Sequence, residues 1–288
     1  EDALFEAYDE ARVRELFQKL GFRSLVSRLP KSQDGFQPTL KRGEGKEIKL
    51  PEGYFIAQSS AEQVKLMEQL LKAEIVAFDT ETDGLGGRVS SIIGMSFAIH
   101  EDSKIQAWYV PTDPHEVLLW KDFFEDAAIQ KTGHNVKYDM EVLLQSGITV
   151  RGIMFDTMLA GYLLKSGTRS YGLDHLAEER LNYSPIPITN LIGSGKNQKS
   201  MKDVPLLELA QYACEDADVS LRLYDLFLPE LREEQLESVL REIEIPLLDV
   251  LVHMETTGVA LDDSVLFKLG HTVSKRISEL EHEIWSQA

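Results

Sequence analysis

Ile75-Val76-Ala77-Phe78-Asp79-Thr80-Glu81 is an apolar run that ends in two carboxylates, and it predicts a buried strand that carries charge. Residues two apart in a strand share one face and lie about 6.5 Å from each other. Asp79 and Glu81 could therefore hold one cation together. Pairs of this spacing also arise by chance, since Asp and Glu make up 48 of the 288 residues. The pair gains weight from two further carboxylates, Asp139 and Asp216, each on the apolar stripe of an expected helix.

Composition bounds the class of protein. A chain of 288 residues with 43% hydrophobic residues predicts a globular protein with one large or two modest domains. A net charge of -18 counts against a protein that coats nucleic acid, but bound divalent metals would supply positive charge within a cleft. The single cysteine, Cys214, excludes an internal disulfide framework and suits a reducing cytosol. No signal peptide or long apolar run is visible, so no membrane contact is expected.

The order of patterns along the chain predicts an α/β fold with a mixed sheet flanked by helices. Residues 1–29 have helical spacing, and residues 31–53 have the composition of a linker. Strands are expected at 53–56, from 75, at 92–99 and at 105–111, with a helix at 61–71. Helices are expected to dominate from His115 onward. Residues 240–288 predict two helices around Thr257-Gly258, and the second runs to the last residue, which suggests a piece of a longer chain or a frayed natural terminus.

Asp139 is the third candidate acid. In Gly133-His134-Asn135-Val136-Lys137-Tyr138-Asp139, Asn135 is expected to be a helix N-cap, and Asp139 lies one turn later on the same face. Val142 and Leu143 continue that apolar stripe. A carboxylate among core positions costs several kcal/mol unless it is paired or bound to metal. The alternative is a buried Asp139 that is paired with a basic group or a backbone donor.

Helical phase selects the fourth acid from the string Tyr212-Ala213-Cys214-Glu215-Asp216-Ala217-Asp218. The helix is expected to begin near Asp203 and Pro205. Tyr212 and Asp216 are four residues apart and face inward together. Asp218 and Arg222 lie on another face at i,i+4, which predicts a solvated ion pair, and Glu215 is expected at the surface.

Asp79, Glu81, Asp139 and Asp216 would repel one another if they converged without a cation. Hard oxygen ligands favour Mg²⁺ or Mn²⁺. Two such ions about 4 Å apart could activate a water and stabilise the leaving oxygen in phosphodiester hydrolysis. Tyr212 could orient that water, because an ordinary tyrosine pKa near 10 makes it a poor base.

Three segments carry a resemblance to a known family: Phe78-Asp79-Thr80-Glu81-Thr82-Asp83-Gly84-Leu85, His134 to Asp139 and Tyr212 to Asp218. They resemble the three motifs of the DEDD-type 3′–5′ exonucleases with a tyrosine in the third motif. The likeness extends to the proofreading domain of bacterial DNA polymerase I, of family A, through Phe155-Asp156-Thr157-Met158, Leu173-Asp174-His175-Leu176-Ala177, Gly193 to Gln198 and Glu244-Ile245-Pro246-Leu247. It therefore covers nearly the whole chain.

This resemblance implies a ribonuclease H-like fold and metal-dependent removal of nucleotides from the 3′ end of single-stranded or frayed DNA. Asp79, Glu81 and Asp216 would hold one of two Mg²⁺ or Mn²⁺ ions, and Asp139 would reach the second through water. Tyr212 would position the nucleophile. The implied substrate contacts are Leu85, Asn135 and Thr80. Leu85 has the alternative of an ordinary core leucine.

The same resemblance predicts the domain boundaries of the chain, its partners and its location in the cell. Residues 1–52 would be the tail of a preceding nuclease plus a linker, 53–235 the exonuclease domain and 236–288 the start of a polymerase region. The expected partners are a DNA 3′ end and the missing polymerase domain, in a monomer in the bacterial cytoplasm. A silent scaffold and an exonuclease that acts on RNA are the competing hypotheses. Ile188 falls where some relatives have an aromatic side chain, and the loop 193–198 lacks the spacing of a phosphate-binding loop.

Overall fold

The computed structural model describes residues 12–13, 16–17, 49–84, 90–195 and 198–287. The chain divides into two units, residues 1–47 and 48–288, and the description below concerns the second. Residues 12–13 and 16–17 are helical. The rest of the expected N-terminal helix, most of the expected linker and Leu85 lie outside the described residues, and the three domain boundaries stay predictions.

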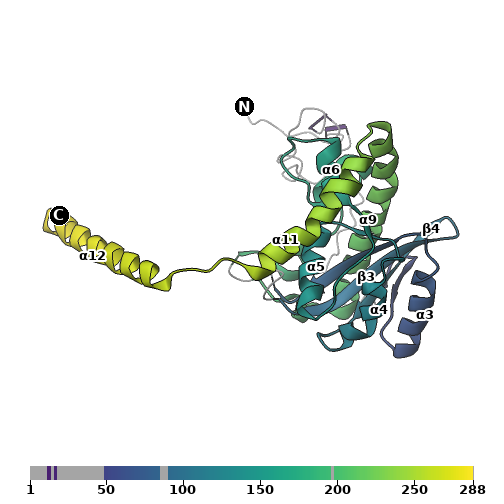
Figure 1. Cartoon of the computed structure of the whole chain (residues 1–288), viewed down its shortest axis with the longest axis horizontal. Helices are drawn as coiled ribbons and strands as arrows, with labels where there is room; N and C mark the ends of the chain where they lie inside the picture. Colours follow the sequence, from purple (N-terminus) through teal and green to yellow (C-terminus); the bar gives the residue numbers. More distant parts are fainter. Residues whose placement is uncertain (1–11, 14–15, 18–48, 85–89, 196–197, 288) are drawn as a thin grey trace, which may run out of the picture. The chain divides into compact units, whose positions relative to one another are not determined.

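A six-stranded mixed sheet is the centre of this unit, in the order β1-β4-β3-β2-β5-β6. The strand β3 runs antiparallel to both of its neighbours, β2 and β4, whereas the other pairs are parallel. The α/β fold with a mixed sheet is therefore confirmed (Figure 1). The strands are β1 (Tyr54–Ile56), β2 (Val76–Thr82), β3 (Ile92–Glu101), β4 (Lys104–Pro111), β5 (Lys131–Gly133) and β6 (Ile153–Asp156).

Helices dominate after His115, as expected, but two short strands that the sequence did not predict, β5 and β6, also lie in that region. These strands are too short for an alternating pattern to appear in the sequence. They form by parallel pairing with β2 and with each other. The helical elements are α3 (Ser60–Leu70), η1 (Glu116–Trp120), α4 (Lys121–Glu125), α5 (Val136–Gln145), α6 (Thr157–Leu164), α7 (Leu173–Leu176), η2 (Ala177–Leu181), α8 (Ile188–Ile192), η4 (Met201–Asp203), α9 (Leu206–Glu233), α10 (Glu237–Val239), η5 (Leu240–Glu244), α11 (Ile245–Thr257) and α12 (Asp263–Gln287).

The two faces of the sheet bury different sets of apolar side chains. On one face, Phe78 of β2 belongs to a cluster with residues of α3, α4, α5 and α11. On the other face, Ala77 of β2 packs in a cluster with residues of α9 such as Ala213 and Ala217. Because side chains alternate along a strand, Asp79 and Glu81 share the face of Ala77, and Thr80 shares the face of Phe78. One strand therefore presents its two acids to α9 and its threonine to α5.

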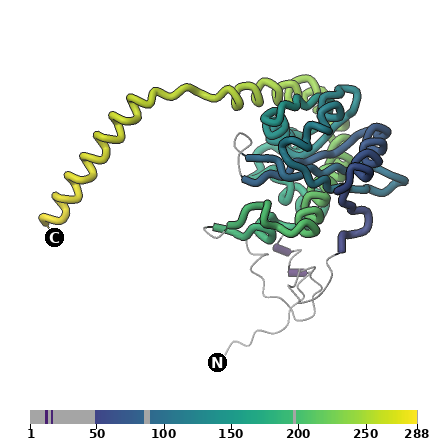
Figure 2. The backbone as a smooth tube through the Cα atoms, turned by 90° about the horizontal axis from the view of Figure 1, so that it is seen from below, coloured from purple at the N-terminus to yellow at the C-terminus, as the bar shows by residue number. Residues whose placement is uncertain are grey.

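The C-terminal helices begin and end close to where the sequence predicts. The first, α11, buries Leu248 and Val252 against the sheet domain and ends at Gly258, whose φ is +72°. The second, α12, has no buried residue. The backbone from β1 to α11 can be followed in Figure 2. The candidate site residues described next lie on the elements from β2 to α9.

Candidate metal centre and nuclease cleft

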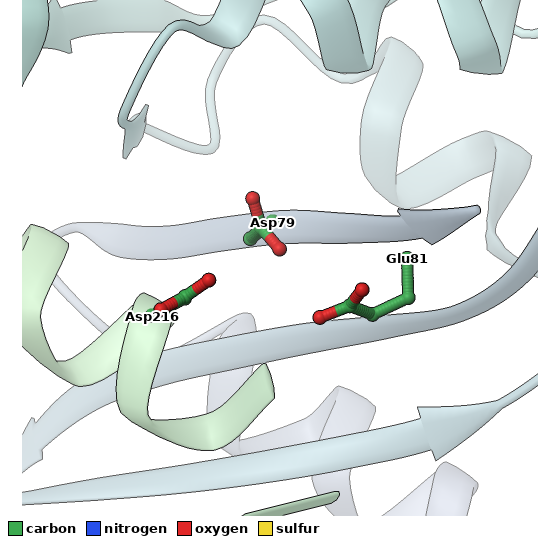
Figure 3. Close-up of side chains that lie close together, drawn as sticks. All are labelled: Asp79, Glu81 and Asp216. Atoms are coloured by element: carbon green, nitrogen blue, oxygen red, sulfur yellow. The ribbon is translucent and has the colours of Figure 1, made fainter. Parts of the chain in front are cut away.

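Three carboxylates from two elements converge at one point. Asp79 and Glu81 of β2 and Asp216 of α9 each offer an oxygen atom, and these three atoms all lie within 4.8 Å of one another. Figure 3 shows the side chains of the two elements turned toward each other. The expected convergence is confirmed for these three acids. They line a cleft of about 600 Å³ together with Thr80, Thr82, Asp83, Gly84, His134, Asn135, Tyr138, Asp139, Met158, Gly172, Leu173, Ile188, Ile192, Gln198, Lys199, Ser200, Met201 and Tyr212.

Asp139 lines the same cleft but stands outside the group of three. Its Oδ1 accepts hydrogen bonds from the Thr80 backbone N–H at 2.9 Å and from the Thr80 hydroxyl at 2.6 Å. Thr80 faces α5 because side chains alternate along β2. It therefore donates to Asp139, the acid that α5 carries. The side chain of Thr80 is thus a positioning group for Asp139. Its expected contact with substrate stays a prediction.

The start of α5 differs from the sequence prediction. Asn135 lies in the left-handed region, with φ of +58°, and its side chain makes no capping hydrogen bond. The cap comes instead from Asp156 at the end of β6, which accepts from the N–H groups of Asn135 and Val136 at 3.3 and 2.8 Å. The same carboxylate caps α6 by accepting from the N–H groups of Met158 and Leu159. Asn135 occupies the N-cap position as predicted, but Asp156 supplies the capping hydrogen bonds and so fixes the helix that carries Asp139.

The electrostatics of the acids fit a cation. Burial raises the pKa of Asp79 to about 7. Burial and the charge of Asp79 raise the pKa of Glu81 and of Asp216 well above their usual ranges. None of the described ion pairs involves these three residues, and Glu81 Oε1 is buried without a hydrogen-bond partner within the described part of the chain. Hard oxygens that repel one another and have no basic partner among the described ion pairs suit Mg²⁺ or Mn²⁺.

Tyr212 lies one turn before Asp216 and lines the cleft. Burial and the nearby charges of Asp216 and Glu81 raise the pKa of its hydroxyl above the ordinary value. The phenol therefore stays protonated at neutral pH, when it can donate or accept a hydrogen bond but cannot serve as a base.

Two acids beside Asp216 are placed differently from the prediction. Glu215, expected at the surface, is only 5% exposed, and it accepts hydrogen bonds from the Tyr183 hydroxyl and the Ile186 N–H. Asp218, expected in a solvated pair, is 6% exposed; it does pair with Arg222, and it also accepts from the Tyr54 hydroxyl at 2.7 Å. The helical pattern missed both residues because α9 is covered on more than one side by segments distant in sequence. The available signal in the sequence was the small apolar residues Ala213, Cys214 and Ala217 around these acids, all of which the structure buries.

An ion pair crosses the rim of the cleft. Lys202 Nζ lies 2.6 Å from Asp83 Oδ2, and the Ser200 hydroxyl donates to the Asp83 carbonyl at 3.1 Å. These contacts join the segment before α9 to the end of β2. Among the described residues that line the cleft, Lys199 is the one lysine or arginine. None of the described ion pairs joins it to Asp79, Glu81 or Asp216.

The family comparison agrees with this geometry. A sequence model described as 3′–5′ exonuclease, of the DNA polymerase A type, matches residues 54–232, well over half of the chain. The chain belongs to this 3′–5′ exonuclease family. The matched range contains the sheet, the three converging acids, Asp139 and Tyr212.

Relatives of the exonuclease domain are bacterial DNA polymerases I. That of Rhizobium leguminosarum is 35% identical over 237 residues, which cover 73% of this chain and 23% of the relative. That of Chloroflexus aurantiacus is 33% identical over 325 residues, which cover all of this chain and 34% of the relative. The chain thus spans no more than about a third of the length of these relatives.

Solved structures share the ribonuclease H-like fold. The POL domain of Pol1 from M. smegmatis, in complex with DNA primer-template and dNTP, has a TM-score of 0.62 at 21% identity and covers 78% of this chain and 36% of that one. Brucella melitensis NrnC with bound Mg²⁺ has a TM-score of 0.53 at 17% identity and covers 71% and 92%. No described helix of the exonuclease domain is both long and apolar enough to cross a membrane.

We expect the metal-free exonuclease domain to lose stability as the pH rises. An unfolded aspartate has a pKa near 3.9, whereas burial raises the pKa of folded Asp79 to about 7. Between these values the folded state holds a proton that the unfolded state has released, so unfolding becomes easier with increasing pH. This loss of stability is complete above about pH 7 and absent below about pH 4. Thermal unfolding in a chelator at about pH 5 and about pH 8 should show a lower Tm at the higher pH, by about 5 °C.

Asp79→Asn is the matched variant for this measurement. It removes one charge from the group, so its metal-free Tm at about pH 8 should exceed that of the parent, and the pH dependence should shrink. Mg²⁺ should raise the Tm of the parent at that pH, because the ion binds only the folded site. A parental Tm that is equal at both pH values and unaffected by Mg²⁺ would contradict the electrostatic description of the site.

Proposed function

We propose that this domain removes nucleotides one at a time from the 3′ end of single-stranded or frayed DNA in a reaction that requires divalent cations. The observation that carries the proposal is the placement of three carboxylate oxygens within 4.8 Å of one another in a cleft of about 600 Å³. A cluster of this kind is costly to fold without a cation, and the family supplies the reaction class.

Each acid has a role in this proposal. Asp79, Glu81 and Asp216 hold one Mg²⁺ or Mn²⁺, and Asp139, fixed by Thr80, reaches toward a second ion. When bound, the two ions neutralise the carboxylates, lower the pKa of a water and stabilise charge on the leaving oxygen. Asp79 is central, because its charge raises the pKa of Glu81, Asp139 and Asp216 alike.

The remaining side chains orient substrate and water. Tyr212 keeps its proton for the reason given above, so it orders the attacking water by hydrogen bonding and leaves proton removal to another group. Asn135 lines the cleft next to the capped end of α5, where it can donate to a phosphate or sugar oxygen. We assign Thr80 and Leu85 to the contact with the terminal nucleotide.

DNA is the proposed substrate because the relatives that match the chain are DNA polymerases I. In that setting the polymerase part of the same polypeptide would deliver a strand with a mismatched end, which is a proofreading role. The isolated domain is proposed to act as a monomer in the bacterial cytoplasm and to bind DNA weakly, since its net charge is -18.

A comparison of DNA and RNA strands tests this function. A single-stranded DNA oligonucleotide labelled at its 5′ end should shorten by single nucleotides in Mg²⁺ and remain intact in a chelator. The matching RNA should be shortened at least about tenfold more slowly, because a site built around a deoxyribose end leaves no partner for the 2′-hydroxyl. Equal rates on both strands would favour an exonuclease without preference for DNA. A scaffold would leave both strands intact in Mg²⁺ and gain no thermal stability from it.

A further inference from the structure

A second carboxylate of α9 reaches the cleft indirectly. Glu215 precedes Asp216, but consecutive helical residues point about 100° apart. Its side chain therefore points away from the three converging carboxylates and contacts the segment before α8. There its Oε1 accepts from the Tyr183 hydroxyl, and its Oε2 accepts from the Ile186 N–H at 2.6 Å. Glu215 is 5% exposed, and glutamate is almost never buried to this extent unless it is paired, as it is here.

The segment that Glu215 holds has few backbone bonds of its own. Pro185 and Pro187 carry no N–H, so Ile186 is the one N–H donor among residues 185–187, and Glu215 takes it. Helix α8 begins directly afterwards at Ile188, with Pro187 as its N-cap residue and no side-chain cap. The position of the first turn of α8 therefore depends on the bond from Ile186 to Glu215.

Neighbouring side chains support the two hydrogen bonds that Glu215 accepts from Tyr183 and Ile186, which we call the clamp. Arg222, four residues after Asp218 on α9, places its guanidinium over the Tyr183 ring at 4.8 Å. Asp218 holds that guanidinium through Nε at 2.9 Å and accepts from the Tyr54 hydroxyl of β1. The Tyr183 ring is thus held from its face by a cation and from its hydroxyl by Glu215.

Helix α8 forms an apolar part of the cleft. Ile188 is 38% exposed and Ile192 is buried, and both line the cleft that contains Asp79, Glu81 and Asp216. An exposed aliphatic side chain across from a metal group can pack against the flat face of a nucleotide base.

We propose that Glu215 is a positioning residue that holds Ile188 against the terminal base of the bound strand, through its bond to the Ile186 N–H. This inference rests on the proposed function, because it assigns how the same cleft grips its substrate. It predicts that Glu215 affects substrate affinity through Ile188 and leaves the chemical step to the acids.

The clamp itself is tested first, without any activity measurement. Hydrogen exchange should be read by mass spectrometry on peptides that cover residues 183–190. Glu215→Ala should speed exchange at Ile186 by about tenfold or more, because its N–H loses a buried acceptor. Glu215→Gln keeps an acceptor oxygen and an N–H₂ that can donate to the Tyr183 hydroxyl, so it should exchange like the parent. Glu233→Ala removes an exposed acid at the end of the same helix and serves as the charge-matched control. Equal exchange in the parent and Glu215→Ala would overturn the clamp.

The consequence for substrate is tested by a double-mutant cycle between Glu215 and Ile188, on single-stranded DNA in Mg²⁺. Glu215→Ala should raise KM about fivefold and leave kcat within about twofold, because the lost contact acts equally in the ground and transition states. Ile188→Ala should raise KM by a similar factor. The double variant should match Ile188→Ala alone, and Glu215→Gln should restore the parental KM.

The outcomes separate the inference from the proposed function. Additive KM effects in the double variant would overturn the route through Ile188. A fall in kcat with unchanged KM would show that Glu215 acts on Asp216 instead, which also overturns the proposal. If the parent releases no nucleotides, the proposed function fails while the exchange measurement still decides whether the clamp exists.

Discussion

Asp79→Ala should abolish nucleotide release, with a fall in rate of about a thousandfold or more, which corresponds to about 4 kcal/mol. The expectation follows from the position of Asp79 within the group. Asp79 supplies one of the three carboxylate oxygens that lie within 4.8 Å of one another. Its charge also raises the pKa of Glu81, Asp139 and Asp216. Because Asp79 interacts with the acids proposed for both cation positions, its loss should disturb both of them. Single-turnover shortening of a labelled DNA strand in Mg²⁺ measures the effect.

The fold should survive this substitution. The alanine removes a repelling carboxylate, so the metal-free variant should unfold at the parental Tm or above it, with an unchanged circular dichroism spectrum. Glu68→Ala, which removes an exposed acid of α3 that does not line the cleft, controls for the change in net charge and should keep the parental rate. Parental activity in Asp79→Ala would refute the nuclease assignment of these acids.

Asp156→Ala should cause a large loss of stability, about 3 kcal/mol, or about 10 °C in Tm for a domain of this size. The Asp156 side chain is 1% exposed, and its two oxygens accept from four backbone N–H groups at the starts of α5 and α6. Alanine would leave one buried and three partly buried donors without this acceptor, and an unsatisfied buried donor costs more than the bond contributes. Thermal and denaturant unfolding measure the loss.

Asp156→Asn is the graded control for this prediction. Its single side-chain oxygen can still accept at one helix, but its amide group would meet a donor at the other, so an intermediate loss of stability is expected. Nucleotide release in Asp156→Asn should fall less than in Asp79→Ala, because α5 still carries Asp139 toward the cleft. A Tm in Asp156→Ala within about 1 °C of the parent would show that Asp156 does not hold the two helices.

Much of the site follows from local periodicity. The alternation of β2 places Asp79 and Glu81 on one face, and the phase of α9 turns Tyr212 and Asp216 toward it, as the sequence predicts. These features depend only on residues a few positions apart, which share a face for geometric reasons.

Tertiary structure alone decided which acids stand apart and which are covered. Asp139 lies beside the group of three because Thr80, on the opposite face of β2, binds it. Glu215 and Asp156 became buried acceptors because segments far away in sequence bring N–H groups to them. Periodicity reports the direction in which a side chain points, but what lies in that direction is set by packing between distant segments. The sequence by itself therefore determined the acids that meet, and the tertiary structure determined what holds them in place.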